Sequence, residues 1–85
     1  MNIVFAPQAF EDYRYWQQAD RVTLRRVNRL IDDIMRDDPY TGLGKPEQLR
    51  YVDGWSRRID EEHRLVYRVV DGDLLILQAR YHYDG

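Results

Sequence analysis

The end of the chain, residues 79–85, places a histidine between two tyrosines, in the order Ala-Arg-Tyr-His-Tyr-Asp-Gly. Histidine is the side chain whose ordinary pKa lets it exchange a proton near neutral pH. Arginine, which is frequent in the second half of the chain, presents a planar fork of donors that matches phosphate oxygens. His82 with arginines on the same face would therefore suit chemistry on a phosphate group.

Cleavage of RNA needs three kinds of group at one phosphate. A base takes the proton of the 2′-hydroxyl that attacks phosphorus, a cation stabilises charge on the equatorial oxygens, and an acid protonates the departing 5′-oxygen. His82 is the candidate acid, and Glu47 is the candidate base. Lys45 and Arg50 lie on the same loop as Glu47, where we expect them to hold its charged form and guide the RNA backbone.

Composition limits the setting of this chemistry. The 85 residues include no cysteine and carry a formal net charge of -2, which suits one compact domain over residues 1–85 and argues mildly against a general nucleic-acid binder. The longest aliphatic run is only Leu74 to Leu77, and the N-terminus has no signal pattern. We therefore expect a cytoplasmic protein with no membrane span, whose fold separates the two signs of charge.

Hydrophobic periodicity predicts two helices and four strands. Pro7 suits the first turn of a helix, and Asp20 can cap a second helix with one apolar stripe, while the Pro- and Gly-containing residues 38–45 form a loop. The expected elements are a strand at 2–5, a helix from Pro7, a helix from Asp20 to about Arg36, and strands at 55–60, 64–70 and 74–82. This β-α-α-β-β-β order predicts an α+β domain in which an antiparallel sheet lies against a two-helix hairpin.

The last strand has two faces because side chains alternate along it. The face that we expect to be core carries Leu75, Leu77, Ala79, Tyr81 and Tyr83, and the other carries Gln78, Arg80 and His82. The length of the turn at Asp71-Gly72 then decides whether Arg64, on the preceding strand, shares the face of His82.

A two-residue turn would set Arg68 against Leu75 on the apolar face, at a cost in desolvation. We therefore expect a three-residue loop over residues 70–72, which pairs Arg64 with the polar face of the last strand. In that register Arg64 and Arg80 share a face with His82.

Five short motifs follow one another along the chain: Tyr13-Arg-Tyr-Trp-Gln, Gly44-Lys-Pro-Glu-Gln-Leu, Trp55-Ser-Arg-Arg-Ile, Glu61-Glu-His-Arg-Leu-Val-Tyr and Arg80-Tyr-His-Tyr. Together they resemble the YoeB (Txe) branch of the RelE toxin superfamily, over nearly the whole chain. The resemblance implies a compact RelE-like fold similar to microbial RNases. It also implies a ribosome-dependent endoribonuclease, the toxin of a bacterial toxin–antitoxin pair, that leaves a 2′,3′-cyclic phosphate.

The resemblance assigns roles to individual residues. Glu47 would be the general base, Arg64 the arginine that stabilises the transition state, and His82 the general acid. Arg58 would contact a phosphate and Tyr83 would position the substrate. Lys45 and Arg50 would lie on the rim that faces RNA and the ribosome, and no cofactor is implied.

The resemblance also implies partners. These are mRNA in the ribosomal A site, a YefM-like antitoxin whose flexible segment folds onto the domain, and a second copy of the chain in a homodimer. The toxin–antitoxin complex is expected to bind operator DNA.

Several alternatives stay open. His63 is expected to point away from the site, Glu62 is a rival for the base, and local ion pairs are expected between Glu61-Glu62 and Arg57-Arg58. Two histidines on opposite faces without cysteine argue against a metal site. The domain as a whole could instead be a non-catalytic module that binds antitoxin, ribosome or gyrase, or a degenerate toxin, for which Asp84-Gly85 beyond the usual terminal tyrosine is a hint.

Overall fold

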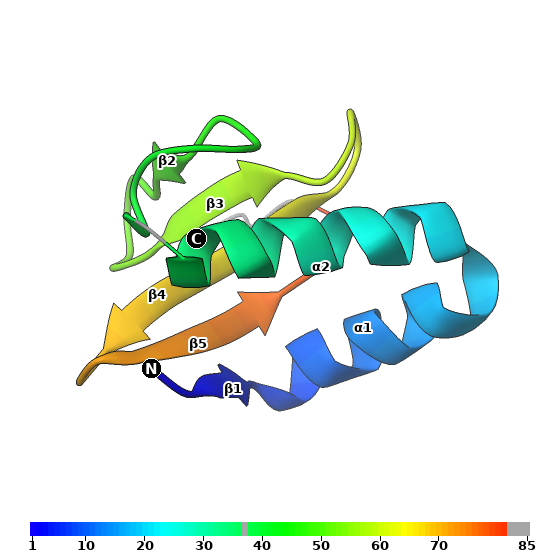
Figure 1. Ribbon diagram of the computed structural model, residues 1–85, viewed down its shortest axis with the longest axis horizontal. Helices are drawn as coiled ribbons and strands as arrows, with labels where there is room; N and C mark the ends of the chain where they lie inside the picture. The colour runs from blue at the N-terminus through cyan, green and yellow to red at the C-terminus, as the bar shows by residue number, and fades with distance from the viewer. Residues whose placement is uncertain (37, 82–85) are drawn as a thin grey trace.

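The computed structural model describes residues 1–36 and 38–81. Its elements in chain order are β1 (Ile3–Phe5), α1 (Pro7–Ala19), α2 (Arg21–Arg36), β2 (Glu47–Gln48), β3 (Trp55–Arg58), β4 (Arg64–Val70) and β5 (Asp73–Gln78). The two helices form a hairpin that covers one face of the sheet (Figure 1). The predicted α+β class with a two-helix layer is confirmed.

The sheet is mixed rather than wholly antiparallel. Its strand order is β1-β5-β4-β3-β2, in which β1 pairs parallel with β5 and the other neighbours are antiparallel. The parallel pairing of β1 with β5 is supported by hydrogen bonds from Leu74 N to Asn2 O (2.8 Å) and from Ala6 N to Ile76 O (2.9 Å). The two-residue strand β2 lies where a loop was predicted, because Glu47 and Gln48 pair with β3.

Helix α2 begins as the sequence predicts. The Asp20 carboxylate accepts hydrogen bonds from the amides of Val22 (3.0 Å) and Thr23 (3.2 Å) and from the Thr23 hydroxyl (2.8 Å). These bonds hold the pKa of Asp20 below its ordinary value, and the bond from the Thr23 hydroxyl has the largest effect. The predicted apolar stripe is also confirmed, with buried side chains at Val27, Leu30, Ile31 and Ile34.

The β4–β5 hairpin has a two-residue turn, so the predicted three-residue loop is wrong. Asp71 and Gly72 both have positive φ, 51° and 79°, which is the geometry of the tight hairpin turns that Asp-Gly favours. Arg68 consequently pairs with Leu75 and is half-buried. The Nε of Arg68 is buried without a hydrogen-bond partner among the described residues, so this register carries the desolvation cost that was expected to disfavour it.

A β-bulge changes the register halfway along the hairpin. Tyr67 pairs with Ile76, whereas Val66 pairs with Gln78, so Leu77 is the extra residue. The bulge reverses the alternation of side chains beyond it.

The buried face of β5 therefore differs from the prediction. Its core side chains are Leu74, Ile76 and Ala79. Of the set expected in the core, Ala79 is buried, Leu75 and Leu77 are half-buried, Tyr81 is 52% exposed, and Tyr83 lies outside the described residues.

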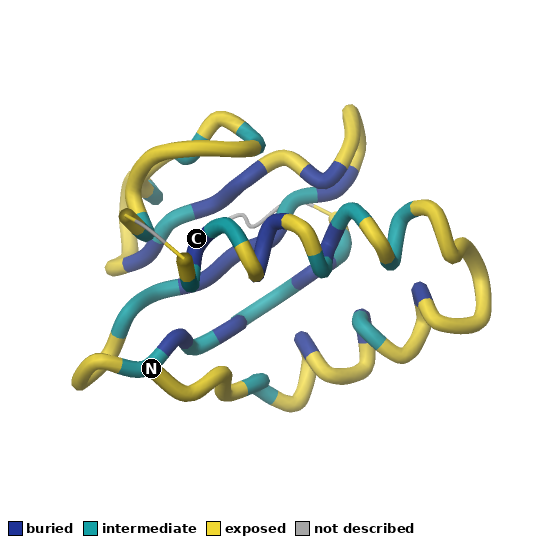
Figure 2. Tube along the Cα trace, in the orientation of Figure 1, coloured by how far each residue is buried: buried dark blue, intermediate teal, exposed yellow. Residues whose placement is uncertain are grey.

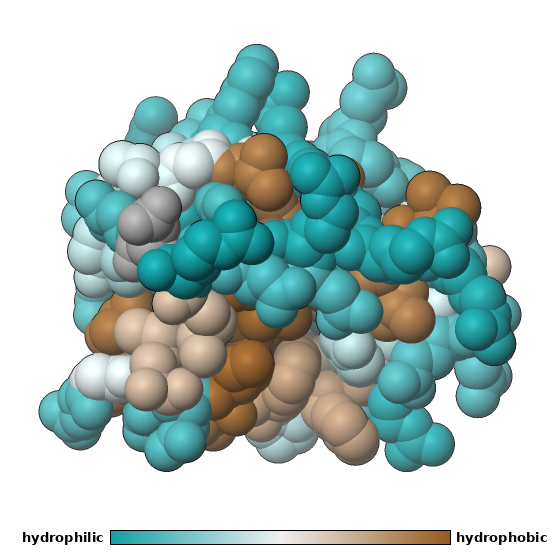
Figure 3. Space-filling model, in the orientation of Figure 1, coloured by the Kyte–Doolittle hydropathy of each residue, from teal (hydrophilic) through white to brown (hydrophobic). Residues whose placement is uncertain are grey.

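The core lies between the helix hairpin and the middle of the sheet. Figure 2 shows buried residues along the inward side of both helices and along the central strands. Figure 3 shows a mostly hydrophilic surface over α2, with apolar side chains gathered between that helix and β1. Within the described residues, neither helix has the length and apolarity needed to cross a membrane.

Candidate active site

Glu47 and Arg64 come together on the sheet face that points away from the helices. Glu47 on β2 pairs with Ser56 on β3, which lies beside β4. Arg64 donates from Nε to the Ser56 hydroxyl (2.9 Å), and its Nη2 lies 3.5 Å from Glu47 Oε2. The predicted base and the predicted transition-state arginine are thus neighbours.

Burial differs sharply between these two side chains. The Arg64 side chain is 15% exposed, whereas that of Glu47 is 66% exposed. Ion pairs this open to water contribute only about 0–1 kcal/mol. Arg64 is therefore held mainly by Ser56, while the Glu47 carboxylate is free to turn toward a substrate.

Ser56 is a site residue that the sequence did not reveal. It is 4% exposed and its hydroxyl fixes the direction of the Arg64 guanidinium. Its place inside the Trp55-Ser-Arg-Arg-Ile motif was a signal. The contact itself depends on the β3–β4 register, which no local pattern in the sequence supplies.

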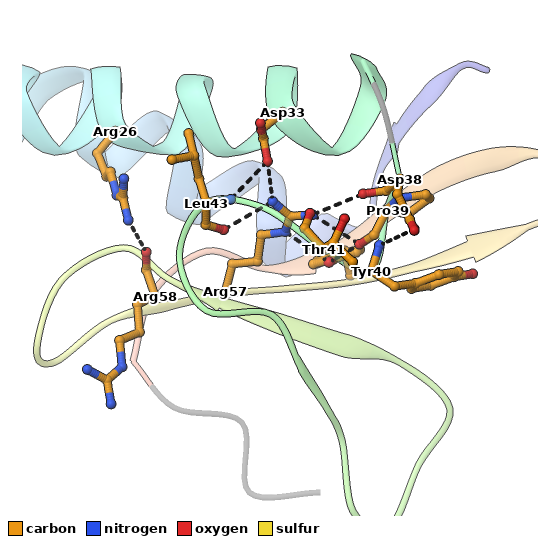
Figure 4. Close-up of polar contacts among 10 residues, drawn as sticks. Arg26, Asp33, Asp38, Pro39, Tyr40, Thr41, Leu43, Arg57 and Arg58 are labelled. Carbon is orange, nitrogen blue, oxygen red and sulfur yellow. Dashed lines mark hydrogen bonds and ion pairs between the residues drawn. The ribbon is translucent and has the colours of Figure 1, made fainter.

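Arg58 adds a second cation to the same face. It pairs directly with Arg64 across β3 and β4, and its exposed side chain points away from α2 (Figure 4). Its carbonyl accepts a hydrogen bond from Arg26 (3.0 Å), but its guanidinium has no ion-pair partner in the described part of the chain. Two neighbouring guanidiniums on one face match the charge and geometry of a phosphate.

Arg57, one residue earlier, points into the protein and organises the loop that leads to Glu47. Its fully buried guanidinium donates to the Asp33 carboxylate (2.6 Å) and to the Tyr67 hydroxyl (3.1 Å). It also donates to three carbonyls of the loop, those of Pro39 (3.1 Å), Thr41 (2.7 Å) and Leu43 (3.0 Å; Figure 4). The predicted pairing of Arg57 with Glu61-Glu62 is wrong, because the alternation of β3 turns Arg57 to the helix side.

The surroundings of Arg57 shift the pKa values of Asp33 and Tyr67. A hydrogen bond from the Leu43 amide, followed by the Arg57 hydrogen bond and charge, holds the pKa of Asp33 below its ordinary value. Burial raises the pKa of Tyr67, which keeps its hydroxyl protonated to donate to the Pro39 carbonyl. The loop is therefore built around a charge pair between the buried Arg57 and the half-buried Asp33.

The last part of the loop turns into β2 through two left-handed residues. Gly44 has φ 81°, and a Cβ there would lie 2.9 Å from Leu30 Cδ2 and 3.1 Å from Arg58 O, so only glycine fits. Lys45 follows with φ 51°. Lys45 and Arg50 are both exposed, on either side of Glu47-Gln48, and their place on a rim that faces RNA stays a prediction.

The end of the chain is tied to α1. The buried Asp12 carboxylate accepts a hydrogen bond from Ala79 N (2.9 Å), and Trp16 Nε1 donates to Ala79 O (2.8 Å). The Arg80 guanidinium carbon lies 3.6 Å from the centre of the Tyr15 ring. Arg80 therefore packs on α1, and its predicted place beside Arg64 is wrong because β5 ends at Gln78 and Asp12 and Trp16 hold Ala79 to α1.

Two predicted site residues are not part of this description. His82 and Tyr83 lie outside the described residues, as do Asp84 and Gly85. The described groups supply an open carboxylate, a fixed guanidinium and a second exposed guanidinium on one face. Phosphoryl transfer to an internal hydroxyl uses groups of these kinds, a carboxylate as base and guanidiniums that stabilise charge on the phosphate.

Comparison with known proteins identifies the family. Residues 5–83 match the model of the YoeB-like toxin of bacterial type II toxin–antitoxin systems. Toxin RelK from Mycobacterium tuberculosis is 55% identical over 84 residues, which cover 96% of this chain and 98% of the relative. Toxin YoeB from Escherichia coli K12 is 48% identical over 85 residues, which cover 98% and 100%.

Solved structures agree with the sequence relatives. The YoeB dimer from Staphylococcus aureus is similar with a TM-score of 0.90 and 48% identity, covering 98% of each chain. A YoeB–YefM complex from the same organism has a TM-score of 0.89 and 46% identity, with the same coverage. The match over nearly the whole length shows that this chain belongs to the YoeB-like toxins of bacterial type II toxin–antitoxin systems.

Proposed function

We propose that this toxin is an endoribonuclease that cleaves mRNA in the ribosomal A site. The observation that supports this most is the pairing of an open Glu47 with Arg64, whose guanidinium Ser56 holds in place. A module that only binds a partner has no need to fix an arginine beside an exposed carboxylate.

The proposed reaction is an internal phosphoryl transfer. Glu47 takes the proton of the 2′-hydroxyl as its oxygen bonds to phosphorus, and the bond from phosphorus to the 5′-oxygen breaks. Arg64 and Arg58 stabilise the charge that builds up on the phosphate oxygens. His82 gives a proton to the departing 5′-oxygen, which leaves a 2′,3′-cyclic phosphate and a 5′-hydroxyl.

The roles of the terminal residues rest on the family resemblance. His82 and Tyr83 follow Tyr81 in the chain, and Arg64 donates its amide hydrogen to Tyr81 O (3.0 Å). The chain therefore reaches the vicinity of Arg64 one residue before His82. This supports the assignment of His82 as the acid and of Tyr83 as a residue that positions the substrate.

The proposed partners follow from the same relatives. A structure of a YoeB–YefM complex from S. aureus supports a YefM-like antitoxin for this chain, and that of a YoeB dimer supports a homodimer. Lys45 and Arg50 are proposed to contact RNA and the ribosome. Binding of operator DNA is proposed for the complex with antitoxin.

Primer extension on a translated message in a purified translation system tests the proposal. Wild type should give breaks at the A site only with ribosomes, and Glu47→Ala should abolish them. Gln48→Ala, which removes the exposed neighbour of Glu47, is the matched control and should cleave like wild type. An absence of breaks from wild type that still binds ribosomes or antitoxin would favour the binding-module alternative.

A further inference from the structure

His63, which the proposed reaction does not use, is held in a defined orientation beside the end of the chain. It is 8% exposed, and its ring lies edge-on to Trp16 (4.9 Å between centroids) and tilted against Tyr81 (5.2 Å). Its amide donates to Asp60 Oδ1 (2.7 Å), and its carbonyl accepts from Ile59 N (2.9 Å). Both the main chain and the ring of His63 are therefore fixed.

The ring of His63 acts as a hydrogen-bond acceptor. Its Nδ1 accepts the amide hydrogen of Tyr81 at 2.8 Å, so Nδ1 carries no proton. The hydrogen of the neutral ring then lies on Nε2, which faces Glu62 Oε2 at 3.4 Å. A single tautomer satisfies both contacts.

Tyr81 needs this support because its backbone is in a conformation that residues with side chains disfavour. Its φ is 62°, in the left-handed region. Its amide is bound by the His63 ring, and its carbonyl accepts the amide hydrogen of Arg64 (3.0 Å). Two consecutive residues, His63 and Arg64, thus hold the backbone amide and the backbone carbonyl of Tyr81.

We propose that His63 is a positioning residue that holds the backbone of Tyr81, the residue before the proposed acid His82, beside Arg64. The proposal rests on the proposed nuclease function. Arg64 connects Tyr81 to the candidate active site, since its amide donates to Tyr81 O while its side chain contacts Ser56 and Glu47. Loss of the Nδ1 acceptor would leave the Tyr81 amide unpaired and release the left-handed turn.

Three substitutions separate this role from simple packing. Asparagine places its side-chain oxygen near the position of Nδ1, glutamine places it near Nε2, and leucine supplies no acceptor. His63→Asn should cleave ribosome-bound mRNA within about threefold of wild type. His63→Gln and His63→Leu should lose about 10- to 100-fold in single-turnover rate, with ribosome affinity unchanged.

Amide hydrogen exchange by NMR provides a readout that does not need activity. The Tyr81 amide should be protected in wild type and in His63→Asn, and should exchange at least tenfold faster in His63→Gln and His63→Leu. Equal Tyr81 exchange in all four proteins would overturn the proposal, as would equal cleavage by all four. If wild type cleaves nothing while the exchange pattern holds, the nuclease function fails and the His63–Tyr81 contact stands.

Discussion

The Arg57 guanidinium, which has no exposed surface, lies 2.6 Å from the Asp33 carboxylate and joins the last turn of α2 to the loop before Glu47. Loss of the half-buried Asp33 carboxylate leaves the buried Arg57 charge without its ionic partner. Asp33→Ala should therefore lower the free energy of unfolding by about 1.5–3 kcal/mol. Asp32→Ala, at the exposed neighbouring position, should change it by less than about 0.5 kcal/mol. Urea unfolding of both variants measures this, and equal effects would contradict the role of the pair.

The stabilising effect of the Asp33 carboxylate should also depend on pH. Because folding lowers the pKa of Asp33, its contribution is complete above the ordinary aspartate pKa of about 3.9 and is lost as the pH falls through the folded value. The stability difference between wild type and Asp33→Asn should be largest at neutral pH and shrink below about pH 4. Unfolding free energies from urea titrations at several pH values give this difference, which would stay constant if the carboxylate charge were unimportant.

Ser56 should matter for catalysis more than for folding. Ser56→Ala removes the acceptor of Arg64 Nε, at a cost of about 1 kcal/mol in stability. The freed guanidinium should lower the single-turnover cleavage rate by about tenfold or more. Ser56→Thr keeps the hydroxyl and should retain more activity than Ser56→Ala. Full activity of the alanine variant would show that Arg64 needs no such support.

Arg64→Lys should not restore the function of Arg64. A lysine cannot reach Ser56 and a phosphate oxygen with one fork of donors, since its charge is a single point. The cleavage rate should fall by about 10²- to 10³-fold, as for Arg64→Ala. Antitoxin binding, measured alongside, should be retained in both variants. A lysine variant with wild-type rate would contradict the proposal that the planar fork of Arg64 is needed at the phosphate.

Local sequence signals predicted the parts of the fold that local physics decides. The Asp20 cap, the apolar stripe of α2 and the Asp71-Gly72 hairpin each depend on residues close in sequence, and all three are present. The parallel pairing of β1 was missed because it depends on how the helix hairpin returns the chain to the sheet.

The candidate site divides in the same way. Glu47 and Arg64 lie together because β2 and β4 both pair with β3, and no local pattern in the sequence signals these pairings. The predicted register of β4 with β5 was wrong because the turn has two residues and a bulge at Leu77 resets the pairing. The contacts of the buried Arg57 with Asp33 and the loop carbonyls were missed because charge spacing alone favoured ion pairs with the nearby Glu61-Glu62. An arginine that faces the core is recognised only once the sheet face is known.

The most direct test of the proposed chemistry is the cleavage of a ribosome-bound message whose scissile nucleotide carries a 2′-deoxy sugar. Wild type should cleave the all-ribose message to a 2′,3′-cyclic phosphate and a 5′-hydroxyl, and should leave the 2′-deoxy message intact. Glu47→Ala should cleave neither, while Gln48→Ala should behave as wild type. Cleavage of the 2′-deoxy message, or full activity of Glu47→Ala on the ribose message, would contradict a 2′-hydroxyl attack assisted by Glu47.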